Sequence, residues 1–280
     1  MCRIIFSHAN GFPASTYRLI FQGLRLAGHR VDAIECIGHD PNYPVSSNWP
    51  MLVKQLAAFA KASADQQAAQ ATWLLGHSLG GYLSMLCAAN HATLEMPKIA
   101  GVIVLDAPII GGWKAQGLRL IKRSPLVGAL LPGRLSRKRR RQWPDKEAVR
   151  SHFENKRPFR RWDPRLLDDY VNFGTRDALD RQGFPCRELV FDRDIETLIY
   201  NTVPDHLERY FYSNRIACPL IYLGGMQSRE ARQIGLESTR KLLHSLPHSA
   251  FIDMEGSHLF PMEYPRDTLN TILKDPSINP

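Results

Sequence analysis

Residues 74–81 read Leu-Leu-Gly-His-Ser-Leu-Gly-Gly, and this stretch decides the fold. An apolar run at residues 72–75 precedes it, and a helix-forming segment at residues 79–89 follows. Glycines two places either side of Ser78 allow a sharp turn from strand to helix, which strains the serine and makes its hydroxyl project. The helix start places the backbone N–H of Leu79 where negative charge develops on a substrate oxygen. The stretch therefore predicts a nucleophilic serine.

Outward from this unit, short β-branched runs alternate with longer amphipathic segments in the first and last thirds of the chain. This alternation is typical of a parallel sheet covered by helices. We expect strands at residues 3–7, 30–36, 72–75, 99–105, 220–224 and 250–254. We expect helices at residues 17–26, 49–62, 79–89, 229–246 and 265–274. The predicted class is α/β, with a mostly parallel sheet of about six strands flanked by helices.

The middle of the chain, residues 107–205, breaks this alternation. It contains many helix formers, many charges and eight prolines, and no segment in it reads as a convincing strand. We therefore expect a helical insertion after the strand that ends at Asp106. The two flanks, residues 1–106 and 206–280, would together form the core.

Cysteines and apolar segments bear on compartment and cofactors. The five cysteines are scattered without a CxxC pair, so neither a disulfide framework nor a metal site is expected. The first twelve residues lack the apolar region of a signal peptide, and no stretch approaches the roughly 18 apolar residues of a membrane span. No dinucleotide fingerprint or phosphate loop is present, so no cofactor is expected. We expect a cytoplasmic protein.

Four segments, taken in chain order, resemble the α/β-hydrolase superfamily. Residues 8–13, His-Ala-Asn-Gly-Phe-Pro, stand where relatives carry an HG-type oxyanion motif. Residues 37–40 resemble the loop after the next strand, residues 76–81 the nucleophile elbow, and residues 256–261 the loop of the catalytic histidine. By this resemblance the chain would begin at the family's third strand. The insertion would be the variable helical cap, or lid, that the capped branch places after its sixth strand.

The base and the acid follow from chain order in this fold, where the serine comes first and the base last. This order selects His258, which would take the Ser78 proton and return it to the leaving group. Relatives usually present an aspartate after the strand at residues 220–224, but the loop here has none. Asp106, at the end of the preceding strand, is the first choice for the acid, and Glu230 is the alternative.

The oxyanion hole needs two N–H donors. Leu79 is the first. The second is Asn10 or, alternatively, Phe12, because the segment at residues 8–13 is two residues longer than the plain version of the motif. The preceding His8 is expected to brace the loop rather than react.

The net charge of +9 lies almost entirely in the insertion. Residues 107–205 hold 21 of the 36 Lys and Arg and 13 of the 27 Asp and Glu, a net +8, which leaves +1 for the rest. The basic run is Arg137 to Arg141, and the segment at residues 113–131 is both basic and apolar, which suits an interfacial lid. Alternatively, its apolar residues face the core and its charges are solvated. A basic and aromatic cluster at residues 156–164 lacks any recognised nucleic-acid fold, so nucleic acid is not an expected partner.

Together these features favour a serine hydrolase that cleaves an acyl ester or thioester through an acyl-enzyme. Carbon–carbon bond hydrolysis and cofactor-free lyase or perhydrolase chemistry also use a serine on this scaffold and stay open. A non-catalytic binder of acidic lipid or nucleic acid is the alternative outside enzymes. The expected partner is a small acyl substrate, anionic or lipid-like if the basic insertion selects it, with peripheral membrane contact through that insertion as a further hypothesis. The oligomeric state stays open.

Overall fold

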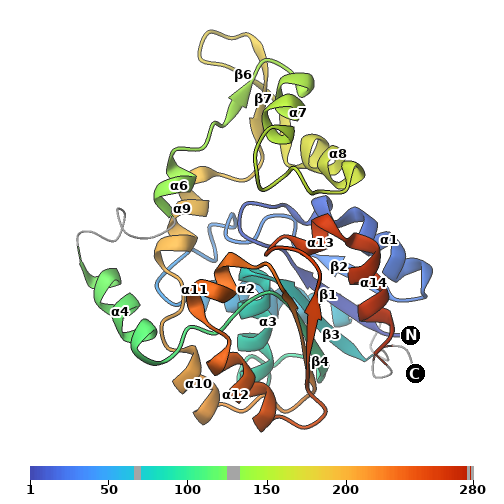
Figure 1. The fold of residues 1–280 in the computed structure, drawn as a ribbon, viewed down its shortest axis with the longest axis vertical. Coiled ribbons are helices and arrows are strands. Elements are labelled where there is room, and N and C mark those ends of the chain that lie inside the picture. The colour runs from blue at the N-terminus through green and yellow to red at the C-terminus, as the bar shows by residue number, and fades with distance from the viewer. Residues whose placement is uncertain (66–70, 125–132, 276–277, 279–280) are drawn as a thin grey trace.

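The computed structural model describes residues 1–65, 71–124, 133–275 and 278. Within these residues the central sheet has six strands in the order β2-β1-β3-β4-β8-β9, and all neighbouring pairs are parallel. The strands are β1 (Arg3–Ser7), β2 (Arg30–Ala33), β3 (Thr72–His77), β4 (Ile99–Leu105), β8 (Leu220–Gly225) and β9 (Ala250–Met254). Figure 1 shows this sheet flanked by helices, so the predicted α/β fold class is confirmed.

Three strands end at other residues than predicted, and β8 differs only by one residue, ending at Gly225. β2 ends at Ala33 rather than at residue 36. The chain leaves the sheet there because the Glu35 carbonyl accepts a hydrogen bond from the Ala14 N–H (3.0 Å) at the start of the 3-10 helix η1 (Ala14–Tyr17). β3 continues past residue 75 to His77, which pairs with the last residue of β4.

Helices cover both faces of the sheet. Successive side chains of a strand point to opposite faces, so Ile5 and Val102 join one hydrophobic cluster while Ile4 and Ile103 join the other. The first cluster lies against α2 (Pro50–Asp65), α3 (Leu79–Ala89) and α12 (Glu237–Ser245). The second lies against α1 (Arg18–Leu26), α13 (Phe260–Glu263) and α14 (Pro265–Leu273).

The helix expected at residues 229–246 is divided in two. α11 (Arg229–Ile234) ends before Gly235, and α12 begins at Glu237. Gly235 has a φ of +87°, a conformation that glycine adopts without steric cost. The break ends the first helix just beyond the loop that follows β8, so Ser228 and Glu230 lie on a short element of their own.

The segment between β4 and β8 is helical in large part, as predicted. Its described helices are α4 (Gly112–Arg123), α6 (Gly133–Arg137), α7 (Lys146–Glu154), α8 (Pro164–Phe173), α9 (Arg193–Asn201) and α10 (Leu207–Ser213). Residues 125–131 of the basic and apolar segment noted above lie outside the described residues. Figure 1 shows α4 at the left edge of the molecule, α6 beside α9, and α7 and α8 together at the top.

The expectation that this segment contains no strand is wrong. β5 (Gln142–Trp143), β6 (Thr175–Leu179) and β7 (Pro185–Leu189) form an antiparallel sheet in the order β5-β7-β6. β6 and β7 read as charged loop because they carry Arg, Asp and Glu on a small, half-exposed sheet. Their pairing comes from the hairpin between them, closed by the bond from the Asp180 N–H to the Phe184 carbonyl (2.9 Å).

Parallel strands bring their carboxyl ends to one edge of the sheet. The neighbours β3, β4, β8 and β9 therefore present the segments that follow them side by side. Ser78, Asp106, Glu230 and His258 all lie in these segments. Among the described residues, no helix combines the length and the apolar character needed to cross a bilayer.

Candidate active site

Ser78 lies on the predicted turn between β3 and α3. Its φ of +53° and ψ of −112° are unfavourable for a residue with a side chain. The turn is possible because two glycines allow neighbouring backbone segments to approach closely. A Cβ on Gly80 would lie 1.9 Å from the Ser7 carbonyl oxygen, and a Cβ on Gly76 would lie 2.1 Å from the Gly80 carbonyl oxygen. Gly76 and Gly80 are therefore required at this turn, because a side chain at either position would clash with a backbone carbonyl.

Asp106 and His258 are joined directly. His258 Nδ1 donates to Asp106 Oδ2 (2.7 Å), and the fully buried carboxylate also accepts from the Gly225 N–H (3.1 Å) and the Ser228 hydroxyl (2.5 Å). Burial opposes the charged carboxylate, but these hydrogen bonds hold the pKa of Asp106 below its usual value. With Nδ1 donating, the Nε2 atom of a neutral His258 carries the lone pair that a base needs.

The charge of Asp106 also acts on its partner. Burial favours the neutral imidazole, but the hydrogen bond to Asp106 and its negative charge outweigh this effect and raise the pKa of His258 above its usual value. Such a pair stabilises the charged imidazolium that forms when a histidine accepts a proton.

Glu230, the alternative acid, lies close to the same pair. One ligand atom from each of Asp106, Glu230 and His258 falls within 4.8 Å of the others. Among the described contacts, only Asp106 is hydrogen-bonded to the imidazole. This grouping could hold a cation in principle, but Asp106 and His258 already satisfy one another, so its geometry suits an acid–base pair. Ser228 lies in the loop where relatives usually carry the aspartate, and its hydroxyl donates to Asp106.

His77 connects three loops, although no sequence signal pointed to it. Its Nε2–H donates to the His258 carbonyl (2.9 Å), and its Nδ1 accepts from the Tyr17 hydroxyl (2.7 Å). The Tyr17 oxygen in turn accepts from the Ala9 N–H (3.2 Å). Burial lowers the pKa of His77 to about 3, so the ring is neutral, as this bonding pattern requires. Because Ser78 follows His77 directly, this chain of hydrogen bonds places the serine turn beside the His258 loop.

The loop after β1 is fixed by His8. Its Nδ1–H donates to the Ala9 carbonyl (2.8 Å), and its Nε2 accepts from the Ile37 N–H (2.8 Å). Burial lowers the pKa of His8 to about 4, which keeps it neutral. The His8 carbonyl accepts from the Gly80 N–H (3.2 Å), so the loop is also bonded to the serine turn. A ring with both nitrogens engaged in this way braces the loop.

The candidate oxyanion donors differ in availability. The Phe12 N–H donates to the Ala9 carbonyl (3.1 Å) and is therefore occupied. Within the part of the chain that the structure describes, the backbone N–H groups of Leu79 and Asn10 donate to no protein acceptor. An oxyanion needs donors that are free to bind it, so the geometry favours Asn10 over Phe12 as the second donor.

The insertion packs directly on this loop. Asn10 Nδ2 donates to the Glu196 carbonyl of α9 (3.0 Å). The Phe12 ring lies against Phe159, Trp162 and Tyr170 of the insertion, with ring centroids 6.4, 5.7 and 5.5 Å away. Sequence reasoning missed these contacts because they join segments far apart in the chain.

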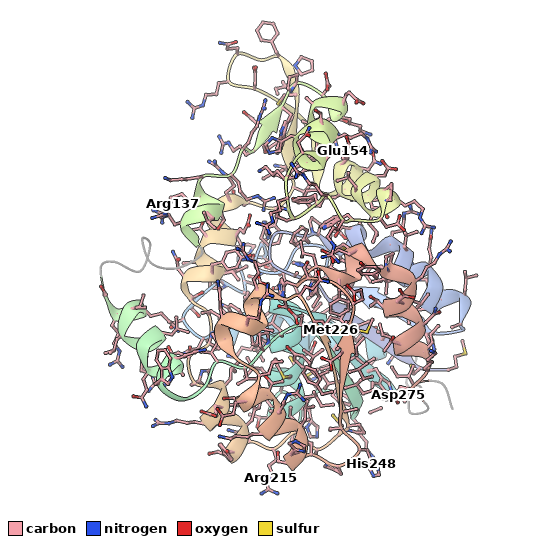
Figure 2. The ribbon with its side chains drawn as sticks, viewed as in Figure 1. Arg137, Glu154, Arg215, Met226, His248 and Asp275 are labelled. Carbon is pink, nitrogen blue, oxygen red and sulfur yellow. The ribbon has the colours of Figure 1, made fainter. Side chains whose placement is uncertain are left out.

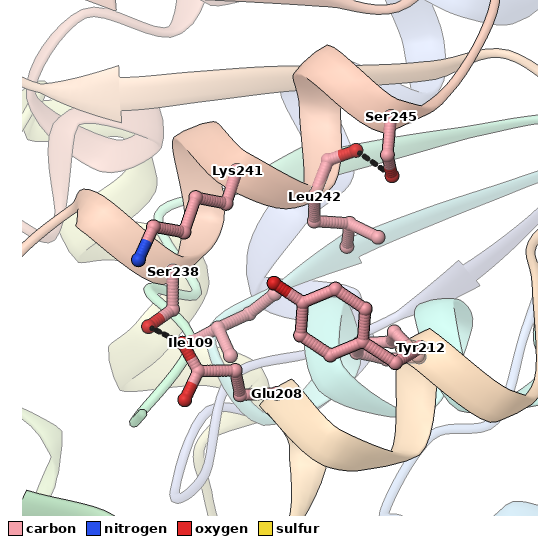
Figure 3. Close-up of a pocket in the computed structure, with 8 residues that line it drawn as sticks. Ile109, Glu208, Tyr212, Ser238, Lys241, Leu242 and Ser245 are labelled. Atoms are coloured by element: carbon pink, nitrogen blue, oxygen red, sulfur yellow. Dashed lines mark hydrogen bonds between the residues drawn. The ribbon is translucent and has the colours of Figure 1, made fainter. Parts of the chain in front are cut away.

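A small pocket between α10 and α12 lies away from this site (Figure 3). Its volume is about 30 Å³, room for little more than a water molecule. Glu208, its acidic residue, already accepts from the Ser238 hydroxyl (2.8 Å) and the Gly112 N–H (2.8 Å). Glu208 is therefore used in joining α10 to α12 and to the start of α4.

The serine turn, the aspartate–histidine pair and the six-stranded parallel sheet together define the class of α/β hydrolases. The chain belongs to the alpha/beta hydrolase family, whose model matches residues 4–271. No curated protein matches the sequence.

Solved structures share this fold at low sequence identity. The peroxisomal α/β-hydrolase Lpx1 from Saccharomyces cerevisiae is 14% identical, with a TM-score of 0.71 over 97% of this chain and 74% of that one. The thioesterase domain from the curacin biosynthetic pathway is 16% identical, with a TM-score of 0.67 over 98% and 91%. An esterase from M. tuberculosis, Rv0045c, is 18% identical, with a TM-score of 0.64 over 97% and 84%. At these identities the similarity shows the fold alone.

Proposed function

We propose that the protein is a serine hydrolase that cleaves an acyl ester or thioester through an acyl-enzyme. The hydrogen bond of 2.7 Å between His258 and Asp106, beside the strained turn of Ser78, carries this proposal. In the first half-reaction the Ser78 hydroxyl attacks the acyl carbon while His258 Nε2 takes its proton. Asp106 remains ionised and stabilises the imidazolium. The N–H groups of Leu79 and Asn10 bind the oxyanion.

The second half-reaction releases the acyl group. His258 first gives its proton to the departing alcohol or thiol, which leaves Ser78 acylated. Water then attacks the acyl carbon as His258 Nε2 takes a proton from it. Collapse of the second tetrahedral intermediate frees the carboxylic acid and returns the proton to Ser78. The esterase and thioesterase named among the solved structures support an acyl substrate of this kind.

The insertion, residues 107–205, serves as the cap in this proposal, and residues 1–106 and 206–280 form the catalytic core. The bond between Asn10 and α9 and the packing of Phe12 against the insertion support this division. The net +8 of the insertion favours an anionic acyl substrate. The five cysteines are free thiols, which supports a reducing, cytoplasmic location.

The proposal is tested with a fluorophosphonate probe and p-nitrophenyl esters of increasing acyl length. We expect the probe to label Ser78 in the wild type, and Ser78→Ala to abolish labelling and lower kcat/KM by a factor on the order of 10⁴ or more. Ser151→Ala, at an exposed serine of α7, is the matched control and should leave both unchanged. Labelling or turnover that survives in Ser78→Ala would contradict the proposal, and a wild type without either activity would favour a non-catalytic binder.

A further inference from the structure

One arginine of the basic run Arg137 to Arg141 is unlike the others. Its neighbours in the run are exposed, and Figure 2 shows Arg137 at the outer edge of the molecule. The Arg139 side chain is only 19% exposed. Its Nη1 donates to Glu196 Oε2 (2.6 Å) and its Nη2 to the Tyr170 hydroxyl (2.7 Å). The guanidinium therefore links the segment between α6 and β5 to α9 and α8 beneath the surface of the insertion.

This ion pair lies against the backbone of the loop after β1. A Cβ on Gly11 would lie 2.9 Å from Arg139 Nη1 and 3.0 Å from Glu196 Cδ, so the backbone of Gly11 touches both side chains. Gly11 has a φ of +81°, which also favours glycine. Asn10, the residue before it, donates from its side chain to the Glu196 carbonyl. Glu196 thus contacts this loop through both its backbone and its carboxylate.

The position of the Asn10 N–H matters because an oxyanion hole works through preorganised geometry. The peptide that carries this N–H lies in a loop, outside the regular ladder of the sheet. On one side the loop is bonded to the serine turn through the His8 carbonyl. On the other side Asn10 and Gly11 contact the insertion, where Glu196 and Arg139 are the charged groups. The rest of the loop is held by His8 and Tyr17. Both charges are largely buried, so removing one would leave the other uncompensated and free to move.

We propose that Arg139, paired with Glu196, is a positioning residue that holds the Asn10–Gly11 backbone in the geometry that binds the oxyanion. This inference rests on the proposed function. It gives one member of the basic run a role in the chemical step, distinct from any attraction of charged partners. The insertion would then contribute to catalysis by fixing a donor that belongs to the core.

The test compares Arg139→Ala with Arg137→Ala, which removes an equal charge two positions away at an exposed site. For a neutral p-nitrophenyl ester we expect Arg139→Ala to lower kcat by about 10- to 100-fold, part of the effect of losing an oxyanion donor altogether. A trifluoromethyl ketone, whose adduct with serine carries an oxyanion, should bind more weakly by a similar factor. KM and the affinity for the product carboxylate should change by less than about threefold. Arg137→Ala should change neither kcat for the neutral ester nor the affinity for the neutral ketone.

Conservative variants make the test independent of folding defects. Glu196→Gln and Tyr170→Phe keep the side-chain shapes while weakening the bonds to Arg139, and each should lower kcat and ketone affinity together. Arg139→Lys should recover part of the activity, because its ammonium can pair with Glu196 but cannot reproduce the two-pronged contact.

Each of the following outcomes would overturn the inference. Equal effects of Arg139→Ala and Arg137→Ala would show that Arg139 acts only through its charge. A change in KM without a change in kcat would show that Arg139 acts on substrate binding. Ketone affinity that stays constant while kcat falls would show that the oxyanion geometry is intact. If the wild type shows no Ser78-dependent turnover, the proposed function fails and the inference with it. If turnover depends on Ser78 but not on Arg139, the inference alone fails.

Discussion

At the residue scale, two carboxylates lie near one imidazole but differ in their contacts. Asp106 is buried and bonded to His258 Nδ1, and the Gly225 N–H and the Ser228 hydroxyl hold its two oxygens. Glu230 lies close by without a hydrogen bond to His258 among the described contacts. A carboxylate that fixes the tautomer and orientation of the base contributes more to catalysis than one that acts only through its charge.

Amide variants should separate these roles. We expect Asp106→Asn to lower kcat by a factor on the order of 10³ to 10⁴, because the imidazole loses both its orientation and the charge that stabilises its protonated form. Glu230→Gln should lower kcat by less than about tenfold. Steady-state kinetics of both variants provide the measurement. Intact turnover in Asp106→Asn together with loss in Glu230→Gln would make Glu230 the acid.

The pH dependence of kcat/KM tests how the nearby carboxylates affect the pKa of His258. The base must be neutral to accept the Ser78 proton, and the pKa of His258 is raised, so kcat/KM should fall as the pH drops through a value above that of an ordinary imidazole. Glu230 also favours the protonated ring, so Glu230→Gln should move this acid limb to lower pH. Profiles of kcat/KM from about pH 5 to about pH 9 test this expectation. An acid limb that stays in place or moves upward would contradict it.

At the scale of elements, the sequence predicted the core better than the insertion. The inner strands β1, β3, β4 and β8 are buried and mostly apolar. Chain order placed Ser78, Asp106 and His258 at the carboxyl edge of the sheet. The hairpin of β6 and β7 gave no such signal because β6 is mostly exposed and both strands carry charged residues. The roles of His77, Ser228 and Arg139 also escaped prediction. Each depends on contacts between segments far apart in the chain, which local patterns do not encode.

Arg187 of β7 shows how a charged side chain can hold the small antiparallel sheet together. The residue as a whole is 5% exposed. It donates to the Thr175 carbonyl (2.6 Å) and hydroxyl (2.9 Å) and to Asp177 Oδ1 (2.7 Å), all on the facing strand β6. The guanidinium thus joins the two strands across the hairpin and satisfies buried oxygens.

Arg187→Leu should therefore destabilise the small sheet by about 2–3 kcal/mol, because buried oxygens of Thr175 lose their donor. Hydrogen exchange of the β6 and β7 amides, with urea unfolding of the whole chain, measures the effect. We expect faster exchange in the hairpin than in the central sheet of the same variant. Arg181→Leu, at the exposed hairpin turn, is the control. Equal exchange in Arg187→Leu and the control would show that the bonds to Thr175 contribute nothing to the hairpin.

At the scale of the whole molecule, charge is divided unevenly between the two parts of the chain. The insertion carries +8 and the rest of the chain +1. Some of the positive charge is used internally, as Arg139 and Arg187 show, but Arg137, Lys138, Arg140 and Arg141 are exposed. A field of one sign beside a site raises the rate at which ions of opposite sign arrive, and salt screens it. The exposed basic run is therefore expected to favour an anionic acyl substrate.

A triple variant, Arg137→Gln with Lys138→Gln and Arg140→Gln, tests this expectation while keeping Arg139. At low ionic strength we expect it to lower kcat/KM about 3- to 10-fold for an ester with an anionic acyl chain and to leave a neutral ester unchanged. Added salt should lower the wild-type value for the anionic ester towards that of the variant. Sedimentation with phosphatidylglycerol and phosphatidylcholine vesicles gives a parallel measurement, since binding of the wild type alone to the anionic vesicles would direct the same charge to a membrane surface. If neither salt dependence nor vesicle binding differs between the two proteins, the exposed charges only hydrate the surface of the insertion, and the site selects its substrate by shape.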